Sequence, residues 1–166
     1  PDSKENENKL AALFAQMTHG TQKNPHTITI HGRELQCNAR ADKAIWFDFR
    51  ALCFGPRSQA DYLYLAEHYE MVFVSGIEKM DESQRAEARR LTWLIDVLYD
   101  YRVKLCASSQ VAAAEIYVEG DFANEFVRTV SRMVEMQSEE YLALPHLVLT
   151  KPAKKAANKS PNLAET

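Results

Sequence analysis

Two short apolar runs flank a stretch of helical periodicity in the middle of the chain. The first run covers residues 71–74, contains two β-branched valines and stops at Ser75-Gly76. The second covers residues 103–107 and is followed by Ser108-Ser109. Between the runs, apolar residues recur at helical spacing at Leu91, Leu94, Ile95 and Leu98. Strand, helix and strand in this order predict a βαβ unit with parallel strands and a right-handed crossover.

The same alternation extends toward the N-terminus. Residues 44–49 predict a strand that is covered on both faces, because Trp46 and Phe47 point to opposite sides of it. Two polar pairs at capping-box spacing predict the starts of the intervening helices: Ser58 with Asp61, and Asp81 with Gln84. Three parallel strands joined by crossover helices are therefore expected between residues 44 and 107.

A turn signal precedes these strands. Residues 26–30 and 34–39 flank His31-Gly32-Arg33, which predicts a hairpin with a short turn. We expect this hairpin at one edge of the sheet. The predicted fold class is thus α/β, with a mixed sheet of three parallel strands joined by crossover helices plus an edge hairpin.

The two ends of the chain lie outside this predicted sheet. Residues 1–20 have the apolar stripe of an N-terminal helix. A second long helix is expected over residues 121–141, and its apolar face would consist of Phe122, Phe126, Val130, Met133 and Val134. Residues 146–166 lose all periodicity and predict a disordered tail. The α/β domain is accordingly expected to span residues 21–145.

Small hydroxyl-bearing residues follow both central strands. In open α/β sheets, ligands gather at the carboxyl ends of parallel strands. A binding site is therefore expected near Ser75, Gly76, Ser108 and Ser109. The alternative is that these residues only satisfy backbone groups in turns.

Composition narrows the classes of protein. A chain of 166 residues with a net charge of −3 suits one domain and argues against general binding to nucleic acid. Its three cysteines cannot all pair, which indicates free thiols in a reducing compartment and predicts a cytoplasmic location. No apolar run is long enough to span a bilayer. The chain begins with Pro1, which is compatible with a piece of a longer protein.

Several catalytic motifs are absent from the sequence. None of its five glycines is followed by lysine, so the phosphate-binding loop G-x-x-x-x-G-K-[ST] does not occur. Cys-x-x-Cys, His-Glu-x-x-His and G-x-S-x-G are missing as well, and no metal site is predicted. A self-sufficient enzyme of a common class is therefore not supported.

Two arginines stand four residues apart in the second predicted long helix. Arg128 and Arg132 would lie on one face and repel each other unless something compensates them. One interpretation is local, because Glu125 and Glu135 lie at ion-pair spacing on the same helix. The other is an anion such as a phosphate, held by two guanidinium groups.

A second candidate anion site lies at a predicted helix start. Arg57 and Ser58 stand where backbone N–H groups and the helix dipole favour negative charge. The alternative is an ordinary helix cap without a ligand.

Several stretches in this order resemble the C-terminal part of the ZapE/AFG1-like P-loop ATPases. They are residues 44–49, 52–53, 56–62, 89–90, 94–96, 98–100, 103–105, 108 and 116–117. The most specific stretch is Arg-Thr-x-Ser-Arg-x-x-Glu-Met-Gln-Ser at residues 128–138. The resemblance covers roughly residues 10 to 142.

This resemblance implies a fold that belongs to an AAA-type P-loop ATPase. It places the nucleotide-binding loop and the acidic strand N-terminal to the matched region, so ATP and magnesium are expected in the full protein and neither in this fragment. Arg128 and Arg132 become candidate nucleotide-sensing or finger arginines. The implied partners are the N-terminal ATPase core and a client protein, in the division ring or elsewhere. A homo-oligomer and a peripheral position at the membrane are compatible with it.

Two functions follow as hypotheses. In the first, the chain is a C-terminal ATPase fragment that completes the nucleotide site or couples ATP hydrolysis to a partner in cell division or protein quality control. In the second, it is a protein-interaction module without a nucleotide role. An independent enzyme that uses the strand-end serines is a third and less favoured reading.

Overall fold

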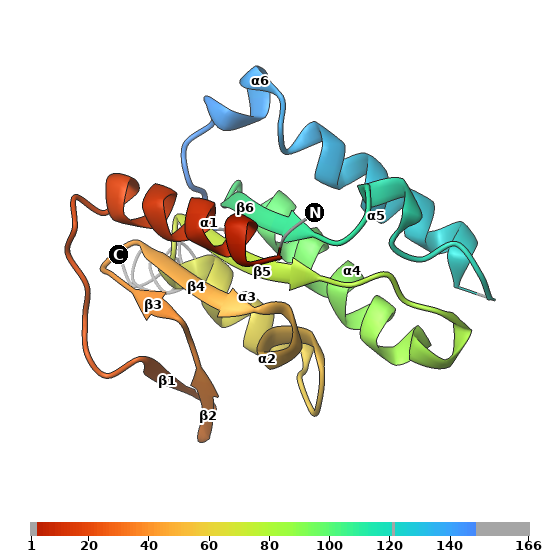
Figure 1. Ribbon diagram of the computed structural model, residues 1–166, viewed down its shortest axis with the longest axis horizontal. Helices are drawn as coiled ribbons and strands as arrows, with labels where there is room; N and C mark the ends of the chain where they lie inside the picture. Colours follow the sequence, from red (N-terminus) through yellow and green to blue (C-terminus); the bar gives the residue numbers. More distant parts are fainter. Residues whose placement is uncertain (1–2, 121, 149–166) are drawn as a thin grey trace, which may run out of the picture.

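Strand β5 (Met71–Ile77) lies at the centre of a four-stranded sheet in the computed structural model, which describes residues 3–120 and 122–148. The strand order is β3 (Ala39–Arg40), β4 (Ala44–Asp48), β5 and β6 (Lys104–Ser109). Strands β4, β5 and β6 run parallel, and β3 is antiparallel to β4 (Figure 1). The three parallel strands expected from the sequence are confirmed.

Strand β5 continues through Ser75-Gly76, where the sequence predicted its end. Ser75 pairs with Asp48 of β4, and the register with β6 shifts between Val74 and Ile77. Gly76 has a φ of 76°, which a residue without a Cβ adopts readily. The glycine therefore makes an irregularity within the strand instead of ending it.

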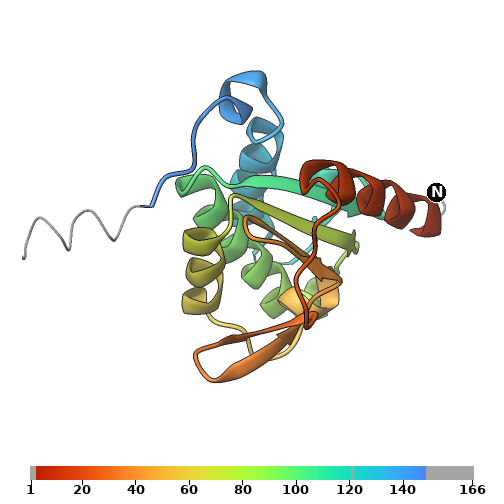
Figure 2. The same ribbon diagram turned by 90° about the vertical axis from the view of Figure 1, so that its left-hand side faces the viewer.

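Helices cover both faces of the sheet (Figures 1 and 2). The first face packs against α2 (Phe49–Cys53), α3 (Gln59–His68) and α4 (Arg85–Asp100), and the second against α1 (Ser3–Met17). Phe47 belongs to the larger core on the first face, and Trp46 to the smaller core under α1. The expected burial of β4 on both faces is thus confirmed.

Both predicted capping boxes are present. The backbone N–H of Ser58 donates to Asp61 Oδ2 over 2.9 Å at the start of α3. The pair of Asp81 and Gln84 begins a 3-10 turn, η1 (Glu82–Gln84), that leads directly into α4.

The hairpin forms a sheet of its own. β1 (Thr27–Ile30) pairs with β2 (Arg33–Gln36) across His31-Gly32, and both turn residues have positive φ, 51° and 80°. Such a turn matches the twist of a tight hairpin. The predicted position at the edge of the main sheet is wrong, because β3 occupies that edge.

Arg33 accounts for the position of the hairpin. Its Nη2 donates to both carboxylate oxygens of Asp61, over 2.8 Å and 2.6 Å, and its Nη1 donates to the carbonyl of Pro56 over 2.7 Å. The side chain of Asp61 is fully buried, with an exposed fraction of 0%. A buried carboxylate needs a paired cation, so the hairpin is drawn toward the start of α3 and away from the sheet.

The predicted single helix over residues 121–141 is wrong, because two helices occupy this region. After a 3-10 turn, η2 (Ala113–Glu115), the chain forms α5 (Ala123–Glu135) and then α6 (Glu139–Leu142). Ser138 separates them, since its Oγ accepts the N–H of Tyr141 and caps the new helix. Val134, expected on the apolar face, is 59% exposed, and Thr129 is buried instead.

Tyr141 and Lys104 attach α6 to the sheet. The Tyr141 hydroxyl donates to the carbonyls of Val103 and Leu98 over 2.7 Å and 3.2 Å. Lys104 Nζ donates to the carbonyls of Tyr141 and Leu144 over 3.0 Å and 2.6 Å. Burial is the main cause that lowers the pKa of Lys104 and raises that of Tyr141. We call this set of contacts the α6 clasp.

We expect Tyr141→Phe to lower the free energy of unfolding by about 1–2 kcal/mol, because the Val103 carbonyl loses the hydroxyl donor and the Leu98 carbonyl keeps only the Val103 N–H. Tyr99→Phe is the matched control, since the Tyr99 hydroxyl donates to Glu135 near the surface. Urea unfolding of both variants measures the difference. Equal urea midpoints of unfolding for the two variants would contradict the expected contribution of the α6 clasp to stability.

The first residues of the predicted tail are bonded to the domain. His146 Nε2 lies 2.6 Å from the carbonyl of Ala66, and the N–H of Leu147 donates to the carbonyl of Tyr101. The remainder of the tail, from residue 149, lies outside the described residues, as do residues 1–2 of the predicted N-terminal helix. No helix within the described residues is long and apolar enough to cross a membrane.

Candidate functional site

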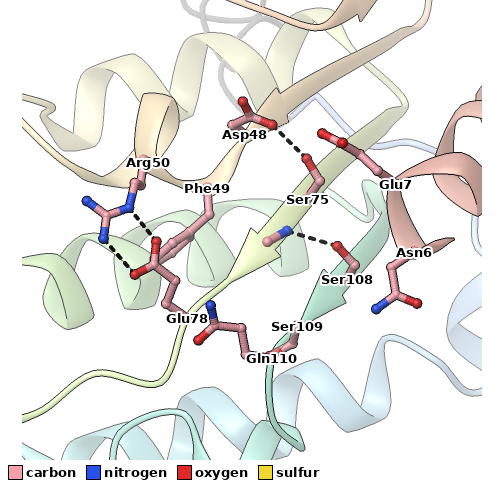
Figure 3. A pocket seen from close by; sticks show the side chains of 11 residues that line it. Asn6, Glu7, Asp48, Phe49, Arg50, Ser75, Glu78, Ser108, Ser109 and Gln110 are labelled. Carbon is pink, nitrogen blue, oxygen red and sulfur yellow. Dashed lines mark hydrogen bonds and ion pairs between the residues drawn. The ribbon is translucent and has the colours of Figure 1, made fainter. Parts of the chain in front are cut away.

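A pocket of about 280 Å³, lined mostly by polar residues, opens at the carboxyl ends of β4, β5 and β6 (Figure 3). All four residues expected at this edge, Ser75, Gly76, Ser108 and Ser109, line it. Other side chains come from α1, from β4 and α2, and from the segments that follow β5 and β6: Asn6, Glu7, Asp48, Phe49, Arg50, Glu78 and Gln110. The sequence therefore located a real pocket, which we call the strand-end pocket.

Hydrogen bonds within the sheet already occupy much of this polar surface. Ser75 Oγ donates to Asp48 Oδ1 over 2.9 Å and accepts from the Trp46 indole over 3.2 Å. Ser108 Oγ accepts the N–H of Gly76 over 2.8 Å. The alternative role of these serines, the satisfaction of local polar groups, is thus also observed.

The strand-end pocket offers little for covalent catalysis. Arg50 and Glu78 form a two-pronged ion pair at its rim, with distances of 2.5 Å and 2.8 Å (Figure 3). No histidine lines the pocket, so a serine with an adjacent histidine base does not arise there. Among the residues that the structure describes, no group of His, Cys, Asp or Glu could hold a metal ion.

The cysteines do not supply a nucleophile either. Cys37 and Cys53 are buried and Cys106 is half-buried, and all three are free thiols. Burial raises the pKa of each thiol, that of Cys53 to about 12. Because the thiolate is the reactive form, these residues are expected to be inert at neutral pH.

A second region, the arginine groove, runs along the outer side of α4. Two adjoining cavities of about 590 Å³ and 440 Å³ share Arg89 and Trp93 in their lining. The arginines that line them are Arg57, Arg85, Arg89, Arg90 and Arg128. Three segments far apart in the sequence, around residues 57, 89 and 128, thus contribute guanidinium groups to one surface.

Arg128 and Arg132 have different surroundings. Arg132 Nη1 contacts Asp96 Oδ1 over 2.6 Å, and its guanidinium lies 4.7 Å from the centre of the Tyr99 ring. Arg128 Nη2 is 3.9 Å from Asp96 Oδ2, and its side chain is 67% exposed. Arg132 is therefore held between α4 and α5, whereas Arg128 remains available at the edge of the groove.

The local ion pairs expected within α5 are not the ones formed. Asp96, on the neighbouring helix α4, is the shared partner of both arginines. Glu135 instead accepts the hydroxyl of Tyr99 over 2.7 Å. The physical reason is that α5 packs against α4, which brings a carboxylate from outside the helix closer than those along it.

Asp96 is the residue that sequence reasoning missed. It lies one turn after Thr92, whose hydroxyl lies 2.8 Å from that of Thr129 and joins α4 to α5. A comparison of the polar residues on the two helix faces would have suggested the pairing, since buried charges in proteins are usually paired.

Arg57 and Ser58 have separate roles in the structure. Arg57 donates from Nε and Nη1 to the carbonyls of Ala51 and Pro56, over 3.2 Å and 3.3 Å, and lines the arginine groove. The N–H of Ser58 is already bonded to Asp61. The helix-cap interpretation of Ser58 is therefore observed, and its role toward an anion remains a prediction.

Comparison with known proteins supports the resemblance. The family model described as AFG1-like ATPase matches residues 1–145. "Cell division protein ZapE" of Escherichia coli (strain K12) is 34% identical over 139 residues, which is 84% of this chain and 37% of the relative. "Lactation elevated protein 1 homolog B" of Danio rerio is 24% identical over 169 residues, covering 81% of this chain and 34% of the relative.

The match is partial in length. The chain spans little more than a third of these curated relatives, 37% and 34%. An uncharacterized protein of Schizosaccharomyces pombe is 38% identical over 90 residues, covering 54% of this chain and 20% of that protein. No solved structure matches the chain significantly.

Proposed function

Because the chain belongs to the AFG1-like ATPase family, we propose that it completes the nucleotide site of such an ATPase or couples ATP hydrolysis to a partner protein. In this proposal, ATP and magnesium bind in the complete protein to the family's phosphate-binding loop, since these 166 residues contain no such motif. In the same proposal, these 166 residues contribute arginines to the nucleotide site and an α/β domain that holds them in place. An AAA-type arrangement of the complete protein belongs to the same proposal.

One observation supports the proposal best: Arg128 is exposed, lies 3.9 Å from Asp96, and stands on helix α5, which packs against α4. Catalysis of phosphoryl transfer depends on positioning and on positive charge beside the developing negative charge. An arginine on a rigid element suits this role, because its guanidinium stays charged and offers a planar fork to phosphate oxygens. Arg132 donates a hydrogen bond to the Asp96 carboxylate and would hold that carboxylate in place beside Arg128.

The proposed client is a protein of cell division or of protein quality control, and the proposed location is the cytoplasm. The division role rests on the relative from Escherichia coli, whose name is that of a cell division protein. No nucleic acid is proposed as a partner, because the net charge of the chain is −3. A peripheral membrane position and assembly into homo-oligomers are compatible with the proposal.

We expect the isolated chain to hydrolyse no ATP and to show no shift of its melting temperature with Mg-ATP. Hydrolysis needs a cradle for the phosphates and ligands for magnesium. Phosphate release by the isolated chain and by the complete protein, each compared with a mock purification, tests this expectation. Turnover by the isolated chain that depends on Arg128 would contradict the proposed division of labour.

The second candidate function is a protein-interaction module without a nucleotide role. It is favoured by Val127 and Val134, which lie two turns apart on α5 and are 63% and 59% exposed. Exposed apolar residues on one helix face suit a partner surface. In this case, replacement of Arg128 in the complete protein would leave ATP turnover unchanged, and replacement of the valines would reduce partner binding.

A further inference from the structure

The larger cavity of the arginine groove has a strong excess of positive charge. It is lined by Arg57, Arg85, Arg89 and Arg90 with a single carboxylate, Glu82, and by Ser83, Ala86 and Trp93. Four arginines and one glutamate line this cavity, on a chain whose net charge is −3. Positive charge is therefore concentrated here, and we call this part of the groove the Trp93 cleft.

Two guanidinium groups in the cleft have no carboxylate partner among residues 3–120 and 122–148. Arg57 is half-buried and bonded only to the carbonyls of Ala51 and Pro56. Arg89 lies 5.5 Å from the centre of the Phe122 ring and forms no ion pair with any residue that the structure describes. By contrast, Arg90 contacts Glu87 over 3.4 Å. Arg57 is half-buried and Arg89 is exposed, and cations without a counter-charge beside them favour an anion from outside.

The shape of the cleft indicates an extended ligand. Arg85, Arg89 and Trp93 succeed one another by one turn along α4, so the two arginines span roughly 6 Å and the row including the indole roughly 12 Å, at about 1.5 Å per residue. A single phosphate group can contact only guanidinium groups that lie within one hydrogen-bond length of it. The row of side chains along α4 is longer than that. An extended peptide of about four residues covers the same distance at about 3.3 Å per residue.

The carboxylates around the cleft argue for a short anionic segment. Glu82 lies at one end of the row, and Glu125 lines the adjoining cavity beyond Arg89. A long polyanion such as nucleic acid would extend past the arginines and be repelled by these two carboxylates. A short acidic peptide would end before it reached them. The half-buried indole of Trp93 adds an apolar surface between the charges, as peptide-binding sites commonly do.

We propose that the Trp93 cleft binds a short acidic segment of a partner protein in an extended conformation, with Arg57 and Arg89 as its main contacts. This inference rests on the proposed coupling of ATP hydrolysis to a partner, and it names the chemistry of that partner. Carboxylate side chains would pair with the guanidinium forks in two-pronged geometry. Because the test measures binding alone, its failure is distinct from a failure of Arg128 in ATP turnover.

The test uses this chain and a fluorescent five-residue peptide that alternates aspartate and glutamate around one central leucine. Fluorescence anisotropy is expected to show saturable binding that weakens with salt. The variant Arg57→Ala with Arg89→Ala is expected to bind at least tenfold more weakly. The matched control, Lys9→Ala with Lys43→Ala, removes the same charge from exposed ion pairs elsewhere and is expected to bind as the original chain does.

Each alternative has its own outcome. Equal binding by the groove variant and the control variant, or no binding by either, would overturn the proposal. If a single-stranded oligonucleotide bound more tightly than the peptide, and its binding depended on the arginines, the ligand of the cleft would be nucleic acid and not a protein. If tripolyphosphate bound more tightly than the peptide, the cleft would be a phosphate site. If the double variant does not fold, Arg89→Ala alone is used in its place. Arg89 is exposed, so this single change is expected to leave the fold intact.

Discussion

Replacing Arg128 by alanine in the complete protein is expected to slow ATP turnover by about 10³–10⁵-fold, the range observed for arginines that contact a transferring phosphoryl group. The expectation rests on an exposed guanidinium whose nearest carboxylate oxygen, on Asp96, lies 3.9 Å away. The same change should barely alter stability, because an ion pair this exposed contributes about 0–1 kcal/mol. A phosphate-release assay and a thermal melt of the same samples separate the two effects.

Two further variants sharpen this experiment. Arg128→Lys should restore little of the rate, since lysine lacks the planar fork. Arg132→Ala should act mainly through stability, because Arg132 is half-buried between Asp96 and the Tyr99 ring. Normal turnover in a folded double variant, Arg128→Ala with Arg132→Ala, would end the catalytic interpretation and favour the interaction module.

Replacing Arg33 by alanine is expected to lower the free energy of unfolding by about 3 kcal/mol, near the lower end for the loss of one partner of a buried ion pair. The pair is asymmetric: the side chain of Arg33 is 40% exposed, whereas that of Asp61 is 0% exposed. The loss therefore consists largely of an uncompensated carboxylate inside the protein. Urea unfolding measures the effect.

A double-mutant cycle identifies this cause. If the buried charge of Asp61 is responsible, Arg33→Ala combined with Asp61→Ala should be less destabilising than the sum of the single changes. Lys43→Ala is the control, since Lys43 and Glu70 form an ion pair with 73% and 45% of their side chains exposed. Additive single effects at Arg33 and Asp61 would mean that the pair does not hold the hairpin.

The parallel core was predictable because its signals are local. Apolar runs with β-branched residues, helical spacing between them and capping pairs are all properties of neighbouring residues. The hairpin turn at His31-Gly32 was predictable for the same reason. Its position was not, because it depends on Arg33 meeting Asp61, which is 28 residues away in the sequence.

The break between α5 and α6 shows a second limit. Residues 121–141 keep an approximate helical period, and the capping role of Ser138 competes with it only weakly in the sequence. What decides is tertiary structure, since Tyr141 reaches the carbonyls of Leu98 and Val103 only after the chain has turned. Periodicity alone does not contain that contact.

The candidate site was predictable in part. The strand-end pocket followed from the topology rule for parallel strands, and its four expected residues line it. The arginine groove was predictable only in part, because Arg57 and Arg128 lie far apart in the sequence and nothing local connects them. Their common surface depends on the packing of α4 against α3 and α5, which brings Arg89 and Trp93 between them.

The α6 clasp determines how mechanical load would enter this domain. Tyr141 and Lys104 tie the C-terminal segment to the amino end of β6, and His146 ties it to the end of α3. A pull on that segment would be transmitted to the sheet through side-chain hydrogen bonds at one edge, before any strand is sheared. The strand-end pocket lies at the opposite, carboxyl end of the parallel strands, β6 included. Tension on the C-terminal segment would thus enter the core at the amino end of β6, the end of that strand that lies away from the pocket.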